Sequence, residues 1–239
     1  MKYMGSKRRI AKDIIPIMLK DMTDGQNFYD LFCGGLNLID KIPKHINRIA
    51  NDTNKYIIEL AKKMQEGWLP NENISEGEFL YIKNNKHLYE DHILGYVGYQ
   101  LSFGSLWFGS YRKDKIGKRN YSIEAYNNIK RQSENIKNIK LYNLSYDEVE
   151  LIPKSIIYCD IPYKNTTGYI TTKEGFDYDK FYDWCIEKHK EGHKVFISEY
   201  EMPQDRFECI WSKEISSSLT KDTGSKKGIE KSFVVKGDL

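Results

Sequence analysis

The chain has 239 residues, 40% hydrophobic and 30% charged, which is typical of a soluble globular protein with a sizeable core. No apolar run is long enough to cross a bilayer and no apolar signal segment begins the chain, so we expect a cytoplasmic protein without a membrane partner. The four cysteines are far apart and the net charge is only +3, so neither a metal cluster nor a disulfide framework is expected, and charge alone does not indicate nucleic acid.

The first stretch with a chemical signal is a basic, glycine-containing turn at residues 2–9, which leads into a helical pattern with one apolar face. Tyr3 and Lys7 in this turn could lie near a ligand, and the alternative is an ordinary solvated surface. A buried strand is predicted next, and Gly34 and Gly35 follow it at once. Glycine permits a sharp turn and a close approach of a ligand to the backbone. The pattern differs from G-x-G-x-x-G, so it predicts no pyrophosphate site.

A second predicted strand, at residues 48–51, ends in Asp52. An acid in this position after a glycine turn is placed to hydrogen-bond ribose hydroxyls. The alternative is that Asp52 caps the helix that begins near Asn54. The spacing between the glycine turn and the acid favours the first interpretation.

Residues 54–138 differ in character, because four helical patterns, at residues 54–66, 76–88, 94–101 and 121–138, surround an aromatic and basic loop at residues 102–121. Between Tyr111 and Tyr121 this loop has five Lys or Arg residues and one Asp. A charged run is often only a solvated surface, but basic side chains interleaved with aromatic and amide groups suit phosphate contact and base readout. We therefore predict that the loop binds DNA through Tyr111, Arg112, Lys113, Lys118, Arg119, Asn120 and Tyr121.

Strand and helix patterns resume after residue 138. They predict a helix at residues 178–190 and strands at residues 139–143, 155–159, 193–199, 207–211 and 232–236. A polar stretch rich in Ser, Lys and Gly, residues 213–231, is predicted to be a mobile loop. The whole pattern predicts an α/β fold with a largely parallel sheet and a helical insertion after its second strand. The predicted domains are residues 1–53 together with 139–239, and residues 54–138.

The strand at residues 155–159 ends in Asp160, Ile161, Pro162 and Tyr163. In an open α/β sheet, ligands bind beyond the carboxyl ends of the strands. The carboxylate and the carbonyl before the proline could accept both hydrogens of an exocyclic amine, and the aromatic ring could stack on a flat base. The alternative is an ordinary strand end followed by a turn.

Four motifs in order resemble the Dam-type family of DNA N6-adenine methyltransferases. Residues 2–7 resemble that family's K-[WY]-x-G-x-K motif, and residues 30–35 resemble its [DE]-P-F-x-G-G motif. Residues 160–163 resemble its D-P-P-Y motif, and residues 197–200 with Pro203 resemble a later strand of phage members. The resemblance implies a Rossmann-like methyltransferase sheet whose helical insertion recognises the DNA target.

The resemblance also implies S-adenosylmethionine as cofactor, with Asp52 on its ribose. The residues carried over to the cofactor are Tyr3, Lys7, Asp30, Phe32, Gly34, Gly35, Asp52, Tyr146 and Asp160. Those carried over to catalysis are Asp160, Ile161, Pro162 and Tyr163. No metal is required. Ile161 departs from the family's first proline, and the acid–aromatic pair for the cofactor adenine has its nearest match in Ser145 and Tyr146.

The implied activity is methylation of the adenine amine in a specific double-stranded DNA sequence, by base flipping and direct methyl transfer. A restriction endonuclease could be a partner. One alternative is a catalytically weakened relative that binds DNA and cofactor, which the isoleucine in the tetrapeptide suggests. The other is a methyltransferase for the cytosine amine or for RNA, and the acidic residue that begins the tetrapeptide argues against cytosine.

Overall fold

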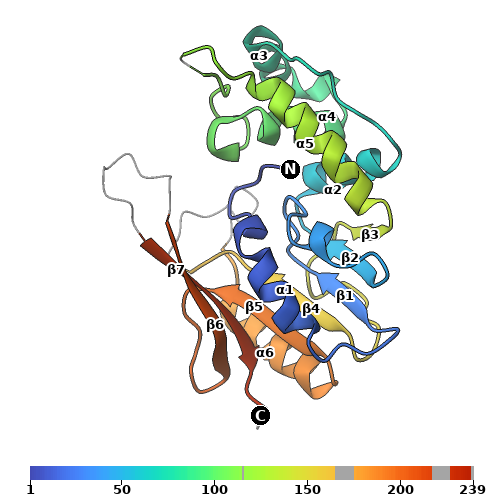
Figure 1. Ribbon diagram of the computed structural model, residues 1–239, viewed down its shortest axis with the longest axis vertical. Coiled ribbons are helices and arrows are strands. Elements are labelled where there is room, and N and C mark those ends of the chain that lie inside the picture. The colour runs from blue at the N-terminus through green and yellow to red at the C-terminus, as the bar shows by residue number, and fades with distance from the viewer. Residues whose placement is uncertain (115, 165–174, 217–226, 238–239) are drawn as a thin grey trace.

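The computed structural model describes residues 1–114, 116–164, 175–216 and 227–237. In these ranges seven strands form one sheet, ordered β3-β2-β1-β4-β5-β7-β6 (Figure 1). Strands β3 to β5 in this order are parallel, and β7 and β6 are antiparallel additions at one edge. The strands are β1 (Asn27–Asp30), β2 (Asn47–Asn51), β3 (Ile139–Tyr142), β4 (Ile156–Asp160), β5 (Lys194–Glu199), β6 (Phe207–Ser216) and β7 (Lys227–Val235). The α/β expectation with a largely parallel sheet is confirmed.

Both faces of the sheet are buried: every residue of β1 and the last four residues of β2 are buried, as in parallel strands that are covered on both sides. Side chains alternate between faces along a strand, so Phe28 lies in one hydrophobic cluster and Tyr29 lies in the other. Helix α1 (Ala11–Leu19) contributes to the first cluster, and helix α6 (Tyr178–Lys190) contributes to the second. These helices therefore cover opposite faces of the central strands.

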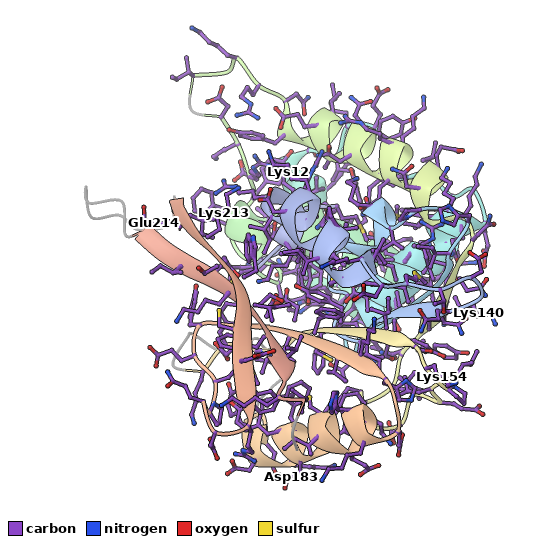
Figure 2. The ribbon with its side chains drawn as sticks, turned by 60° about the horizontal axis from the view of Figure 1, so that its bottom comes forward. Lys12, Lys140, Lys154, Asp183, Lys213 and Glu214 are labelled. Carbon is purple, nitrogen blue, oxygen red and sulfur yellow. The ribbon has the colours of Figure 1, made fainter. Side chains whose placement is uncertain are left out.

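The last two strands are longer than the sequence predicted. Apolar residues predict only residues 207–211 and 232–236, whereas β6 and β7 stay paired out to Ser216 and Lys227, with one register shift between Cys209 and Trp211. An antiparallel pair needs no continuous apolar run, so polar residues continue it at the edge of the sheet. The Lys213 ammonium, 2.7 Å from Asp13 Oδ2, ties β6 to α1. Figure 2 labels Lys213 and, on the same side of the molecule, Lys12 of α1. The mobile-loop prediction for residues 213–231 is therefore wrong at both ends, and its middle, 217–226, lies outside the described residues.

The predicted insertion is helical, and its helices gather at one end of the molecule (Figure 1). The longer ones are α2 (Lys55–Gln65), α3 (Glu76–Asn84), α4 (Asp91–Gly95), a π-helix (Tyr96–Gln100) and α5 (Tyr121–Ile136), and two short 3₁₀ helices are Lys86–Leu88 and Phe103–Ser105. A capping box between Ser75 and Glu78 begins α3. The expected single helix at residues 94–101 is instead the end of α4 followed by the π-helix. One hydrophobic cluster contains Phe28 of the sheet and Ile129 of α5, so the division into two domains stays a prediction.

Candidate active site

The carboxyl ends of β1, β2 and β4 meet at a cavity of about 520 Å³. All nine residues predicted for the cofactor line it, namely Tyr3, Lys7, Asp30, Phe32, Gly34, Gly35, Asp52, Tyr146 and Asp160. Pro162 lines it as well, whereas Ile161 and Tyr163 are not among its described lining residues. Segments far apart in the sequence thus converge where parallel strands end.

Asp52 is fixed by two backbone hydrogen bonds. The Gly34 N–H donates to Asp52 Oδ2 at 2.7 Å, and the Asn54 N–H donates to Oδ1 at 2.8 Å. Burial raises the pKa of Asp52, and these two hydrogen bonds lower it only in part. The acid therefore joins the glycine turn to the start of α2, and it still lines the cavity. Asn54 is the N-cap residue of α2, and among the described residues no side chain caps this helix, so the interpretation of Asp52 as the cap is wrong. Its role as a ligand group stays a prediction.

The glycine turn is shaped by Tyr3. A Cβ atom on Gly34 would lie 2.7 Å from Tyr3 ring carbons, and one on Gly35 would lie 2.8 Å from Tyr3 Cβ and from Asn37 Nδ2. Gly34 also has a φ of +44°, which disfavours other residues. The glycines thus permit close packing of the N-terminal segment against the turn, a contact that the sequence did not predict.

We expect Gly35→Ala to weaken cofactor binding about tenfold, because the added methyl group displaces Tyr3 from the cavity wall. A tenfold change in the dissociation constant corresponds to about 1.4 kcal/mol of binding free energy. Isothermal titration calorimetry with S-adenosylmethionine measures this effect. Gly237→Ala is the matched control, since a Cβ there meets nothing within 4 Å. Equal affinities of Gly35→Ala and Gly237→Ala would contradict the packing argument.

Two buried polar atoms at the cavity lack partners among the described residues. They are Asp30 Oδ1 and Asn37 Nδ2, and both side chains line the cavity. Burial, and then the nearby Asp160 and Asp52, raise the pKa of Asp30 well above its usual range. A buried acceptor and a buried donor without partners are suited to a ligand with its own donors and acceptors, such as the amino acid end of S-adenosylmethionine. Asn37 was not predicted, and only its place after the glycine turn could have indicated it.

An aromatic wall completes the cavity. The rings of Phe32 and Tyr146 are stacked with centroids 5.6 Å apart, and Phe176 meets Phe32 edge-on at 5.9 Å. Burial raises the pKa of the Tyr146 hydroxyl, so it is neutral. Such a surface suits a flat ring system like adenine. Phe176 was not predicted, because it lies outside every motif.

Asp160 is paired with Lys7. The Lys7 ammonium is 2.9 Å from Asp160 Oδ1 and 3.5 Å from Glu230 Oε2, and it is buried. Burial raises the pKa of Asp160 to about 6, although Lys7 lowers it. Burial alone would lower the pKa of Lys7, but the two carboxylates raise it, so Lys7 stays charged. The acid at the end of β4 is therefore a carboxylate at neutral pH.

Two other residues of the tetrapeptide, Ile161 and Tyr163, are not among the described residues that line the cavity. The Tyr163 hydroxyl donates to Glu230 Oε2 at 2.7 Å, and the Lys7 ammonium lies 4.5 Å from the Tyr163 ring centroid. Ile161 is 2% exposed, and its side chain belongs to the second hydrophobic cluster. The roles predicted for Tyr163 and for the Ile161 carbonyl stay predictions.

A comparison with protein families decides the relationship. The model of the D12 class N6 adenine-specific DNA methyltransferases matches residues 3–94 and 106–227. The chain belongs to this family. The matched residues include the N-terminal turn, the glycine turn and the tetrapeptide, so the predicted family is confirmed.

Among solved structures, this D12 class chain is similar to SMU.472, a candidate methyltransferase complexed with SAH. The identity is 13% and the TM-score 0.38 over 95% of this chain. The chain spans about half, 52%, of the length of that protein.

The basic loop of this D12 class member is already engaged in contacts. The Arg112 guanidinium stacks on the Tyr121 ring at 3.8 Å, and Arg119 makes two hydrogen bonds to Glu124 at 2.7 and 2.9 Å. The other predicted residues of the loop differ in their contacts. The Tyr111 hydroxyl donates to the Ile74 carbonyl, and Lys113 pairs with Glu76. Asn120 caps α5, and Lys118 is exposed. Their predicted role in DNA binding is untested by this geometry.

Within the described ranges, no group of three or more His, Cys, Asp or Glu side chains is arranged to hold a metal ion. In the same part of the chain, no helix has the length and apolar character needed to cross a membrane.

Proposed function

We propose that the chain is an S-adenosylmethionine-dependent methyltransferase that methylates the N6 amine of adenine in double-stranded DNA. The observation that supports this most is the convergence of the family's motifs on one cavity, with the Asp160 carboxylate at its edge. A specific recognition sequence, a restriction endonuclease partner and a cytoplasmic location are further parts of the proposal.

The lining residues fit the cofactor. Asp52 would bind the ribose hydroxyls, Asp30 would accept from the amino group, and the ring wall of Phe32 and Tyr146 would hold the adenine. When bound, S-adenosylmethionine supplies an electrophilic methyl group. Asp30 and Lys7, which both line the cavity, are buried.

The protein's own part in the reaction is to position and polarise the target amine. The adenine leaves the base stack, because its amine is otherwise enclosed in the duplex. The Asp160 carboxylate and the Ile161 carbonyl accept the two amine hydrogens, which directs the nitrogen lone pair out of the ring plane. As the nitrogen gains positive charge, the fixed Asp160 carboxylate stabilises it. Tyr163 would stack on the extruded base.

The proposal is tested by expressing the chain in a host without adenine methylation and sequencing the host DNA for N6-methyladenine. We expect methylation at one short sequence with the wild type. Methylated cytosine, or methylated RNA with unmodified DNA, would instead support the other substrate classes. No modified nucleic acid at all would contradict the proposal.

Replacing Arg112, Lys113, Lys118 and Arg119 with alanine should weaken DNA binding about tenfold and lower its salt dependence. Each phosphate contact that forms releases counterions from the DNA, so a variant with fewer contacts releases fewer of them. Fluorescence anisotropy at several salt concentrations measures both effects. The Arg119–Glu124 pair makes Glu124→Ala an informative companion, since it frees Arg119 for a phosphate and should not weaken binding. A quadruple variant with unchanged affinity and salt slope would show that another surface binds DNA.

A further inference from the structure

Glu230 places a second carboxylate near Asp160. It lies on β7, beyond the last residue that the family model matches, and is 6% exposed. The pairing of β7 with β5 places Ser232 beside Ser198, next to the carboxyl end of β4. A residue far from the tetrapeptide in sequence is thereby brought to the side of Asp160 that faces Lys7.

Glu230 contacts both neighbours of the catalytic acid. Its Oε2 accepts from the Tyr163 hydroxyl at 2.7 Å and lies 3.5 Å from the Lys7 ammonium. Lys7 in turn is 2.9 Å from Asp160 Oδ1. One buried ammonium therefore serves two carboxylates, and a lysine with three donors can do so.

The charge balance explains why the second carboxylate matters. If Lys7 had only Asp160 as a partner, the pair would be neutral and Oδ1 would be occupied by the ammonium. Such a pair offers little stabilisation to a nitrogen that gains positive charge. A second carboxylate on the far side of Lys7 restores a net negative charge, which is what the developing cation needs.

We propose that Glu230 is a positioning residue that holds the Lys7 ammonium and the Tyr163 hydroxyl, so that Asp160 Oδ1 is released to the target amine. This inference rests on the proposed function and deepens it. When the amine enters, the ammonium keeps a carboxylate partner while its contact with Asp160 lengthens. Buried charge is thus never left unpaired, which would be costly.

Other charged or titratable groups face Asp160 from the neighbouring elements. They are Lys7, Asp30 of β1, Tyr158 of β4, Tyr163, Glu199 of β5 and Glu230. Burial is the main cause of the raised pKa of Asp160, and Glu230 and Glu199 add to it. Removing the charge of Glu230 should therefore lower the pKa of Asp160 from about 6.

The test is Glu230→Gln, which removes the charge and keeps an oxygen for the Tyr163 hydroxyl. We expect the single-turnover rate on duplex DNA at saturating cofactor to fall about tenfold, since a fixed counter-charge is lost from the site. The acid side of its pH–rate profile should move to lower pH. Carbon-13 NMR titration of the aspartate carboxyl groups, without DNA or cofactor, should show the same direction of change for Asp160. Glu230→Asp keeps the charge and should recover part of the rate.

Glu208→Gln is the matched control, because it removes an exposed glutamate from the adjacent strand β6. A Glu230→Gln variant that keeps the wild-type rate and the Asp160 titration would overturn the inference while the proposed function stands. A fall in rate without a change in either pH dependence would also overturn it, since that result indicates a merely structural role. A wild type that methylates no DNA would overturn the proposed function and this inference with it.

Discussion

Replacing Asp160 with alanine is expected to lower methyl transfer to DNA by about a thousandfold or more, the scale seen when a main electrostatic stabiliser is removed. The carboxylate is the acceptor that β4 presents at the cavity, and at neutral pH it is charged because its pKa is about 6. Lys7 is not left as an unpaired buried cation, because Glu230 remains 3.5 Å from it. The fold should therefore survive, and the loss should be one of chemistry.

Transfer of a tritiated methyl group to duplex DNA measures the rate, and calorimetry measures cofactor binding. We expect Asp160→Ala to bind S-adenosylmethionine within about threefold of the wild type, since Asp30 and Asp52 remain. Asp24→Ala, at an exposed acid far from the cavity in the turn before β1, is the matched control. Activity retained in Asp160→Ala would show that another group binds the amine.

Local patterns in the sequence predicted most of the fold. The bounds of α6 agree with the prediction, because Asp177 caps its start and apolar and polar residues alternate with helical period. The buried strand β4 is recognisable as an apolar run that ends at an acid and a proline. The outer halves of β6 and β7 were missed, because their strand conformation comes from pairing with each other, and a single strand of polar residues carries no such signal.

Contacts between segments that are distant in the sequence also explain which residues of the site were not predicted. Asp30, Asp52 and Asp160 stand at or just after strand ends, which is where an open α/β sheet binds ligands. Tyr3 and Lys7 follow no strand, and the family resemblance alone assigned them to the cofactor. Glu230 and Phe176 reach the site by tertiary contacts alone. Glu230 in particular depends on the insertion of β7 between β5 and β6, an order that no periodicity in the sequence reveals. The ion pair between Lys7 and Asp160 was likewise unforeseen, although each residue was predicted separately.

The isoleucine in the tetrapeptide gives the second large expected effect. If only the Ile161 carbonyl mattered, Ile161→Pro would leave turnover unchanged or raise it, because proline restricts Asp160 to extended conformations. The structure changes this expectation. The Ile161 side chain is 2% exposed and belongs to the hydrophobic cluster that contains Phe181 and Trp184 of α6. Proline has a smaller, ring-closed side chain, so the exchange leaves a gap in a close-packed core.

We therefore expect Ile161→Pro to lower the free energy of unfolding by about 2 kcal/mol, as other losses of buried aliphatic volume do. Single-turnover methylation should slow about tenfold, because the end of β4 that positions Asp160 is less firmly packed. Urea unfolding and single-turnover kinetics at saturating cofactor measure the two effects. Ile161→Val is the matched control, since it keeps the branch at Cβ and removes one methyl group; about 1 kcal/mol and a near-normal rate are expected. A proline variant as stable as the wild type and faster would show that the side chain is dispensable, and that the backbone of Asp160 limits the rate.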